Sequence, residues 1–395
     1  MPALSDTDFG NGSRCVPRFD KTCVTQFVST KCEKQLRFSL HPTATAFRSE
    51  REALDLPHPQ VRPNLAAIQR AGDEWGQAKI ADLEEHFGAS LVVGGPKTVV
   101  ASATGRALRV SASALAEHLG PQLAAGTFLV ECEFDADTNV LRQAFGLEEI
   151  QAVDAPGPLV FARARPDIIE VITADLPGAR VARQRVTPDG GVEDLPEDDT
   201  RVQLRIVDVK LTSEPGPHYF AELAYYAVAL AGWLAEHGLE DRFVVHPKPG
   251  VWPGSESAGP LATARAAGAN GARMRAAFND ELETVPLTIF LAEVRRLLGE
   301  VLPRVLATPY PALQWAVTPR CQGCENLGQR FYPAPGTRAS DWDERHCLPT
   351  AARTGDLCRI PYVSQGSTRV LRQRGLPDVA SVAQASLTDS AFEAH

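Results

Sequence analysis

The first informative pattern in the chain is the run LRIVDVKLT, in which apolar and charged residues alternate. Successive side chains of a strand point to opposite faces of its sheet. The run therefore predicts a strand with Val207, Val209 and Leu211 on one apolar face. Asp208 and Lys210 stand together on the other face. A half-exposed strand with a solvated charge pair gives the same pattern, so this run alone does not indicate a function.

Helical and β-prone segments alternate along the rest of the chain. Helical spacing of apolar residues predicts a helix over residues 64–88, ended by Gly88. The run YFAELAYYAVALAGWLA, which begins at Tyr219, predicts a packed helix, and a long helical region is expected over 261–306. The β-prone runs are SLVVGG, TVVASA, TFLVECEFD, GPLVFARARPDIIEVITADL and DRFVVHP.

Two further segments complete the predicted fold. The run CVTQFVSTKCEKQLRFSLHP predicts one helix, with Phe27, Leu36 and Phe38 as apolar anchors. Residues 186–200 are polar, acidic and rich in turn formers, which predicts the tip of a hairpin. Strands flanked by helices, together with an antiparallel hairpin, indicate an α/β fold with a mixed central sheet and a helical surround.

Length and composition set the scale of the fold. The chain has 395 residues, of which 44% are hydrophobic and 23% charged, values typical of a soluble globular protein with more than one subdomain. We divide it into an N-terminal helical segment, a core, a helical region and a Cys-rich segment with a helical tail. The predicted bounds are 1–60, 61–260, 261–315 and 316–395.

Charge and hydropathy exclude some classes of partner. A net charge of −9 argues against a uniformly basic nucleic-acid binder but allows a local basic channel. The run MPALSDTDFGNGSRC has no apolar core of a secretory signal, and the longest apolar run is short for a membrane span. We therefore expect a cytoplasmic protein without a membrane partner, where clustered cysteines more often bind metal than form disulfides.

A second acidic residue sharpens the interpretation of the opening run. Asp167 follows a proline in another β-prone run, and the predicted hairpin separates it from Asp208. If the two strands pair, both carboxylates lie at one end of the sheet, where a divalent cation such as Mg²⁺ would relieve their repulsion. Lys210 could then orient a water or stabilise developing phosphate charge, which suits metal-assisted phosphodiester hydrolysis. This spacing by itself is common by chance.

The helix that follows Lys210 adds a more specific pattern, with Glu222 and Tyr226 four residues apart on one face. A strand with Asp-x-Lys, followed by such a helix, resembles the RecB-like branch of the PD-(D/E)XK nucleases. The family pattern is Gln-x-x-x-Tyr, and Glu222 replaces its glutamine. The resemblance implies a restriction-endonuclease-like fold in which Asp167 and Asp208 bind Mg²⁺ or Mn²⁺ and Lys210 assists the attacking water. It also implies that Glu222 and Tyr226 support the site and contact nucleic acid.

The resembled family places a further metal ligand, His or Glu, on an early helix. The matching segment here is AGDEWGQAKIADLEEHFG, and the aligned position is Gly76. Glu74 and Gln77 lie beside it, and Glu74 is the candidate metal ligand. Both also suit the exposed face of an amphipathic helix, so this part of the metal site is a departure from the family pattern.

The cysteines form a second candidate site. Cys321 and Cys324 belong to a C-x-x-C turn, which can direct two sulfurs at one metal, and Cys347 would add a third thiolate. A fourth ligand is needed for zinc or for an iron–sulfur cluster. It could be local, from His346 or Cys358, or it could come from a distant part of the chain.

The resemblance favours a distant fourth ligand. Iron–sulfur members of this nuclease branch, including the CRISPR-adaptation and AddB-type nucleases, use one cysteine before the nuclease core and three after it. The run TQFVSTKCEKQLRF resembles their N-terminal cysteine helix and nominates Cys32. The implied ligands of a structural [4Fe–4S] cluster are Cys32, Cys321, Cys324 and Cys347, with a C-terminal zinc site as the alternative. Cys15 and Cys23 are predicted to be free thiols and Cys132 a small buried side chain, while Cys358 stands where an apolar residue would be ordinary and stays open as the last ligand in place of Cys347.

The basic residues indicate how nucleic acid could bind. The tail LCRIPYVSQGSTRVLRQRGLPDVASVAQAS predicts helix, Gly turn and helix, and it resembles a helix-hairpin-helix-like segment whose amides meet phosphate. Residues 301–375 carry ten Arg and Lys against five Asp and Glu. Arg180, Arg183 and Arg185 add positive charge that we expect near the active site. Such charges favour contact with the nucleic-acid backbone, although they also suit a solvated face.

Together these features predict a Mg²⁺- or Mn²⁺-dependent deoxyribonuclease. Its expected substrate is single-stranded DNA or DNA ends, and the family implies a role in DNA repair or anti-phage defence. The chain has no P-loop, so a helicase or ATPase partner would be a separate protein. Two alternatives remain: a catalytically impaired DNA-binding scaffold, and a zinc-binding interaction protein.

Overall fold

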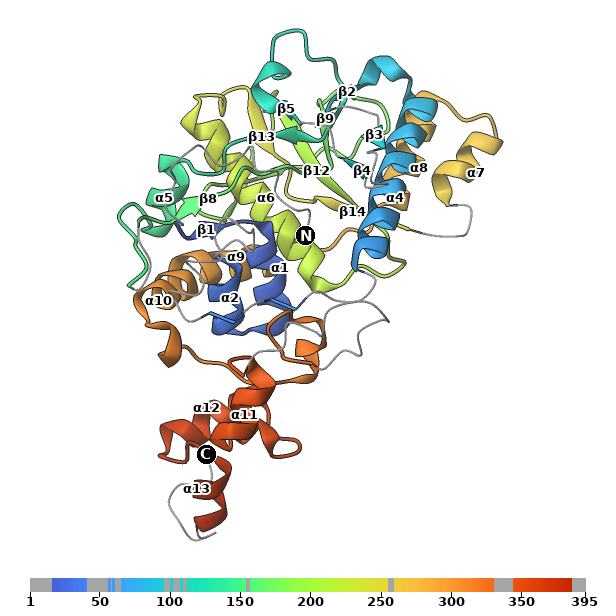
Figure 1. Ribbon diagram of the computed structural model, residues 1–395. Coiled ribbons are helices and arrows are strands. Elements are labelled where there is room, and N and C mark those ends of the chain that lie inside the picture. Colours follow the sequence, from blue (N-terminus) through green and yellow to red (C-terminus); the bar gives the residue numbers. More distant parts are fainter. Residues whose placement is uncertain are drawn as a thin grey trace.

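A mixed sheet forms the centre of the protein, with helices on both of its faces (Figure 1). The computed structural model describes the following residues: 16–40, 56–57, 59–60, 65–95, 100–101, 107–108, 112–153, 157–254, 259–329 and 344–385. The predicted α/β class, with a mixed central sheet flanked by helices, is confirmed.

The central sheet combines parallel and antiparallel pairs. In spatial order its strands are β11 (Val192–Asp194), β10 (Gln184–Val186), β13 (Phe243–Val245), β12 (Val202–Lys210), β9 (Ile168–Ile172), β6 (Phe128–Val130) and β2 (Val92–Gly94), with β14 (Gly250–Pro253) paired to the second half of β12. The parallel pairs are β2–β6, β12–β13 and β12–β14, and the other pairs are antiparallel. The longest strand, β12, therefore lies in the middle and carries the charged run.

Short two-stranded pairs lie outside this sheet. They are β1 (Arg18–Phe19) with β8 (Val160–Phe161), β5 (Ser113–Ala114) with β7 (Cys132–Glu133), and β3 (Val100–Ala101) with β4 (Ala107–Leu108). The predicted strands over TFLVECEFD and GPLVFARARPDIIEVITADL are thus each divided in two. In the first, the break falls at Glu131, whose φ of 47° is incompatible with an extended strand.

Helices cover both faces of the sheet and bury two separate apolar clusters. One face carries α1 (Lys21–Thr30), α2 (Glu33–Ser39), α5 (Asn139–Phe145), α6 (Pro217–Glu236), α9 (Thr288–Arg296) and α10 (Leu302–Ala307). The other carries α4 (Leu65–Phe87), α7 (Pro260–Ala266) and α8 (Gly271–Glu281). Helix α6 is buried along most of its length, which confirms the packed apolar helix. In the described part of the chain, no helix is long and apolar enough to cross a membrane.

Strand β12 sends side chains into both clusters. Leu204 and Ile206 pack under α6, whereas Val207 packs with the residues under α4 and α8. This alternation agrees with the predicted strand. Leu211 is an exception, because β12 ends at Lys210 and leaves the Leu211 side chain 51% exposed.

Two predicted helical segments are interrupted. The N-terminal segment forms α1 and α2 rather than one helix, since Lys31 ends α1 in the left-handed region (φ 54°) and Cys32 caps α2 by accepting the Gln35 N–H at 3.4 Å. The predicted anchors Phe27, Leu36 and Phe38 are buried. Residues 261–306 likewise form α7, α8, α9, a π-helical stretch over Leu297–Val301, and α10.

The predicted hairpin tip is present between β10 and β11. Gly190, with φ of 74°, lies in the turn, and Thr187 N–H donates to the Gly191 carbonyl across it. Strands β10 and β11 form one edge of the sheet. Strands β9 and β12 are therefore neighbours in the sheet, although this hairpin lies between them in the sequence.

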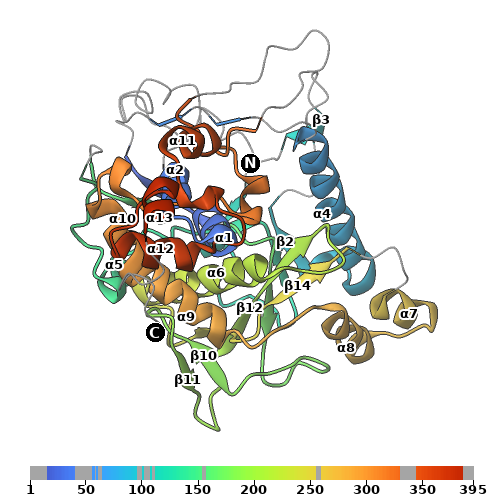
Figure 2. The same cartoon turned by 90° about the horizontal axis from the view of Figure 1, so that it is seen from below.

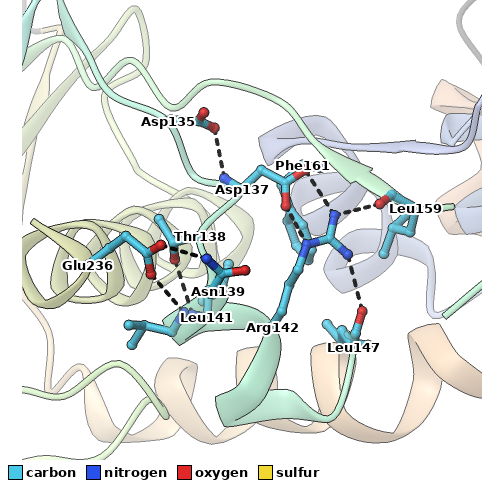
Figure 3. Close-up of polar contacts among 11 residues, drawn as sticks. Asp135, Asp137, Thr138, Asn139, Leu141, Arg142, Leu147, Leu159, Phe161 and Glu236 are labelled. Atoms are coloured by element: carbon cyan, nitrogen blue, oxygen red, sulfur yellow. Dashed lines mark hydrogen bonds and ion pairs between the residues drawn. The ribbon is translucent and has the colours of Figure 1, made fainter. Parts of the chain in front are cut away.

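Arg142 fixes α5 against the chain around it (Figure 3). Its guanidinium donates to both Asp137 oxygens, at 2.5 and 2.9 Å, and to the carbonyls of Leu147 and Leu159. At the start of α5, Glu236 accepts hydrogen bonds from the Asn139 amide and the Val140 N–H. These bonds attach α5 to the C-terminal end of α6.

The C-terminal helices project below the N-terminal segment in Figure 1 and overlap it in the view from below in Figure 2. They are α11 (Cys347–Thr354), α12 (Gln365–Gln373) and α13 (Val379–Gln384). Gln365 donates from Nε2 to the Lys31 carbonyl at 2.9 Å, and Arg372 donates to the Trp315 carbonyl at 3.3 Å. The left-handed Gly375 separates α12 from α13, which confirms the predicted helix, Gly turn and helix.

His246 is a buried neutral histidine near the edge of the sheet. Its Nε2 contacts the Arg180 carbonyl at 2.9 Å, and its Nδ1 accepts the Lys248 N–H at 3.1 Å, so Nε2 carries the proton and donates. Burial, reinforced by Arg205, lowers the pKa of His246 to about 4. The unfolded chain binds this proton near pH 6.5, whereas the folded chain does not until near pH 4.

We therefore expect acid to destabilise the protein through His246. Its contribution is fully present above pH 6.5 and is lost as pH falls toward 4, and between pH 7 and pH 5 it amounts to about 2 kcal/mol. His246→Gln should lose less stability than the wild type over that interval, as measured by urea unfolding at both pH values. Equal losses for the two proteins would contradict this assignment.

Candidate active site

The pairing of β9 with β12 brings the two predicted aspartates together. Val207 pairs with Ile168 in the antiparallel register, so Asp208 and Asp167 lie next to each other one residue further along. Asp167 Oδ2 accepts the Val209 N–H at 2.7 Å, which fixes its carboxylate against β12. The prediction that these strands pair and that both carboxylates lie at one end of the sheet is confirmed.

Asp208 is fully buried and forms an ion pair with Lys210. The distance from Lys210 Nζ to Asp208 Oδ2 is 2.6 Å, while Oδ1 of Asp208 is buried and accepts no hydrogen bond from any described residue. Burial raises the pKa of Asp208 well above its usual value; Lys210 opposes this, and Glu222 and Asp167 add to it. A buried carboxylate oxygen without a donor is costly unless a cation or proton satisfies it.

Helix α6 adds Glu222 to this group. Gly216 precedes the helix and Pro217 begins it, an arrangement suited to a helix N-terminus because proline has no N–H to leave unpaired. Glu222 lies one turn further on, and its Oε1 is 3.6 Å from Lys210 Nζ. Burial raises the pKa of Glu222, but Lys21 and Lys210 outweigh this effect and the pKa falls below its usual value. Glu222 is therefore an anion in this group.

Lys21 is a fourth charged partner of these acids, and the sequence reasoning missed it. Its Nζ is 2.7 Å from Glu222 Oε1, and it lies at the first position of α1, which packs against α6. Burial lowers the pKa of Lys21, yet Glu222, Asp208 and Asp167 together raise it above its ordinary value. No motif marks Lys21, because it comes to the site from a helix that is distant in sequence.

Tyr226 supports the site from within the core. Its side chain is buried, and its hydroxyl donates to the Arg165 carbonyl at 3.1 Å, two residues before Asp167. The hydroxyl therefore holds the turn that presents Asp167. Contact of Tyr226 with nucleic acid, which the resemblance implied, does not fit this conformation because the ring is 2% exposed.

The early-helix metal ligand is not assembled as predicted. Glu74 is exposed on α4, and no contact among the described residues joins it to Asp167 or Asp208. A side chain at Gly76 would meet no atom within 4 Å, so nothing fills the aligned position. Gln77 has a buried Oε1 without a hydrogen-bond donor among the described residues. The structure therefore does not show Glu74 in contact with the two aspartates.

No known family model matches this chain, and no curated protein matches it.

Two aromatic side chains at the start of α6 complete the surroundings of Lys210. Lys210 Nζ is 5.4 Å from the ring centroid of Tyr219, and the His218 and Tyr219 rings lie 4.0 Å apart. Burial lowers the pKa of His218 and raises that of Tyr219. In the sequence, the only sign of His218 and Tyr219 is the position of the run PHYF, since one helical turn separates His218 from Glu222.

The cysteine group joins the N-terminal segment to the region after α10. Gln35 connects several of its members: its N–H donates to Cys32 Sγ at 3.4 Å, and its Oε1 accepts from Cys324 Sγ at 2.6 Å. Cys324 N–H donates to the Cys321 carbonyl at 2.8 Å, which closes the C-x-x-C turn. Cys347 N–H donates to the Asn326 carbonyl at 3.1 Å. The structure thus brings the distant Cys32 next to the C-terminal cysteines.

The pKa shifts of the thiols place the same cysteines together. Burial raises the pKa of Cys32 to about 11 and that of Cys324 to about 12, and Cys321 contributes to both. Burial also raises the pKa of Cys347, with contributions from Cys32, Cys324 and Cys321. All four predicted cysteines therefore lie close enough to affect one another's pKa. No three His, Cys, Asp or Glu side chains of the described residues are arranged as ligands of a single metal ion.

The remaining cysteines stand apart from this group. Burial, with Asp356 adding to it, raises the pKa of Cys358 to about 11. Cys23 and Cys132 are buried free thiols in the core, as predicted. Cys15 lies outside the described residues.

The arginines expected beside the active site lie elsewhere. Arg180 pairs with Asp280 at 2.6 Å and Arg185 with Glu193 at 2.8 Å, while Arg183 donates to the Glu197 carbonyl. This segment adjoins the start of β12, since Ala182 N–H donates to Gln203, whereas Asp208 lies near the end of the strand. The prediction that these arginines lie near the active site is wrong.

Proposed function

We propose that the protein is a Mg²⁺- or Mn²⁺-dependent deoxyribonuclease with a restriction-endonuclease-like core. The observation that carries this proposal is the convergence of Asp167, Asp208, Lys210 and Glu222 from β9, β12 and α6. The buried, donor-free Oδ1 of Asp208 suits a cation ligand, and hard cations prefer carboxylate oxygens. These residues therefore fit a divalent metal held by Asp167 and Asp208.

The proposed roles of the side chains follow from their positions. When bound, the cation would supply an activated water and charge neutralisation at phosphorus. Lys210, with Nζ 2.6 Å from Asp208 Oδ2, would orient the attacking water and offset negative charge on the phosphate. Tyr226 holds the backbone before Asp167, and burial of Asp208 excludes competing water from its carboxylate.

We also propose that Cys32, Cys321, Cys324 and Cys347 bind a structural [4Fe–4S] cluster. The proposal is supported by the contacts of Gln35 with Cys32 and Cys324, which join the N-terminal cysteine to the C-terminal ones. The choice of a cluster over zinc rests on the resemblance of the N-terminal cysteine helix to that of the iron–sulfur nucleases.

Nuclease activity is tested by incubating the purified protein with end-labelled single-stranded and duplex DNA. We expect cleavage with Mg²⁺ or Mn²⁺, none with excess EDTA, and a preference for single-stranded DNA or ends. The family suggests a place in DNA repair or anti-phage defence, with any helicase or ATPase as a separate subunit. Absence of cleavage on every DNA, with the cluster intact, would overturn the enzymatic proposal.

A catalytically impaired DNA-binding scaffold is the second candidate. It is favoured by the exposed Glu74 and the empty position at Gly76, which leave the site without the expected third metal ligand. Specific DNA binding by a protein that neither binds Mn²⁺ nor cleaves DNA would support it.

The cluster proposal predicts different effects for two neighbouring cysteines. Cys347→Ser should remove most of the iron, acid-labile sulfide and brown absorbance near ~400 nm, because it deletes a ligand. Cys358→Ser is the matched control and should retain them, since Cys358 stands apart from the group. The reverse result, or a colourless protein that contains stoichiometric zinc, would contradict the assignment and favour a zinc-binding interaction protein.

A further inference from the structure

Lys21 occupies a position that its own helix disfavours. It is the first residue of α1, where Asp20 caps the helix by accepting the N–H groups of Thr22 and Cys23. A positive charge at a helix N-terminus opposes the helix dipole. The Lys21 side chain is therefore held by a partner outside its own helix. That partner is Glu222, whose Oε1 lies 2.7 Å from Lys21 Nζ.

The two lysines of the site share one oxygen atom of Glu222. Lys21 Nζ is 2.7 Å and Lys210 Nζ is 3.6 Å from Oε1, while Lys210 is closer to Asp208, at 2.6 Å. Without Lys21, the buried Glu222 carboxylate would have Lys210 as its nearest cation. Lys210 would then be drawn from Asp208 toward Glu222, since an unpaired buried charge is costly.

Lys21 differs from the other members in its access to solvent. Its side chain is 41% exposed, whereas those of Glu222 and Asp208 are 4% and 1% exposed. Among the described residues, Lys21 and Lys210 are the lysines paired with Glu222 and Asp208, so Lys21 offsets part of the negative charge that would hold a divalent cation. Loss of Lys21 would increase that negative charge without removing a carboxylate.

We propose that Lys21 is a positioning residue of the nuclease site, which neutralises Glu222 and so keeps Lys210 on Asp208. This inference rests on the proposed nuclease function. The proposal predicts opposite changes in two quantities when Lys21 is removed. The affinity for the metal ion should rise because the site is more negative, and the catalytic rate should fall because Lys210 is displaced. A merely structural defect would lower both.

The test measures kcat, KM and Mn²⁺ affinity, the last by electron paramagnetic resonance of free Mn²⁺. For Lys21→Met we expect kcat to fall about 30-fold with KM changed less than about threefold, and Mn²⁺ affinity to rise about tenfold. Lys21→Arg should recover most of the wild-type kcat. Lys79→Met is the matched control: it breaks another Lys–Glu pair, to Glu281 at 3.4 Å on the opposite face of the sheet, and should change neither quantity.

The double variant Lys21→Met/Glu222→Gln decides the mechanism. Once Glu222 is neutral, loss of Lys21 should matter little, so the double variant should lie within about threefold of Glu222→Gln in kcat and in Mn²⁺ affinity. If Lys21→Met lowers kcat equally in both backgrounds, or raises KM alone, the proposal is wrong although the nuclease function stands. A wild-type protein that neither binds Mn²⁺ nor cleaves DNA overturns both proposals.

Discussion

Replacement of Asp208 by asparagine is expected to lower the rate of Mg²⁺-dependent DNA cleavage by about 10³-fold or more. The asparagine would keep the shape of the side chain but would lose the anion that faces both Lys210 and the proposed cation. Since the amide also removes a buried charge, and Lys210 retains Glu222 nearby, the free energy of unfolding should fall by no more than about 1 kcal/mol. Initial rates and urea unfolding measure the two effects.

Asp194→Asn provides the matched control for this experiment. Asp194 lies on the exposed edge strand β11, where it accepts a hydrogen bond from Gln184 at 2.9 Å. The same substitution there should leave cleavage unchanged. Retention of more than a tenth of the wild-type rate by Asp208→Asn would remove Asp208 from the catalytic group.

Replacement of Glu170 by glutamine should destabilise the protein by about 3–5 kcal/mol. Glu170 is fully buried between two buried arginines: Arg205 donates from Nε at 2.8 Å, and Arg275 donates from Nη1 at 2.6 Å. Arg275 also donates to the Gly126 carbonyl, so the group joins β9, β12 and α8. The amide would leave two buried guanidinium groups without a counter-charge.

Glu193→Gln is the control for Glu170→Gln. Glu193 also pairs with an arginine, Arg185, at 2.8 Å, but its side chain is 56% exposed. Exposed pairs contribute between 0 and about 1 kcal/mol. Urea unfolding should therefore show a large loss for the buried pair and a small one for the exposed pair, and similar losses would show that burial does not govern the cost.

The parts of the fold that follow local patterns were predictable from sequence. Alternation identified β12, and helical spacing with a terminal glycine identified α4, whose Ile80 and Leu83 are buried. The first half of α4 shows the limit of periodicity, because Ile68 is 65% exposed although it fits the apolar spacing. The break between α1 and α2 was missed, since it depends on a left-handed lysine rather than on glycine.

The candidate site was predictable only where its residues share a strand or a helix. Spacing within strand β12 places Asp208 beside Lys210, and spacing within helix α6 places Glu222 on the same face as Tyr226. Lys21 arrives from another helix, and a single-sequence pattern carries no information on that contact. The cysteine grouping was reached through resemblance, because spacing alone left His346 and Cys358 open as ligands.

Lys31 connects three parts of the chain that are far apart in sequence. Its side chain pairs with Glu293 on α9 at 2.6 Å, its carbonyl accepts a hydrogen bond from Gln365 on α12, and its left-handed backbone precedes Cys32. A shortened protein that stops before α11 would retain every strand of the central sheet, yet it would uncover this corner and lose Cys347. A fragment for biochemical work should therefore begin no later than β1, whose Phe19 is buried, and extend through α12, and a fusion partner at the C-terminal side should follow α13.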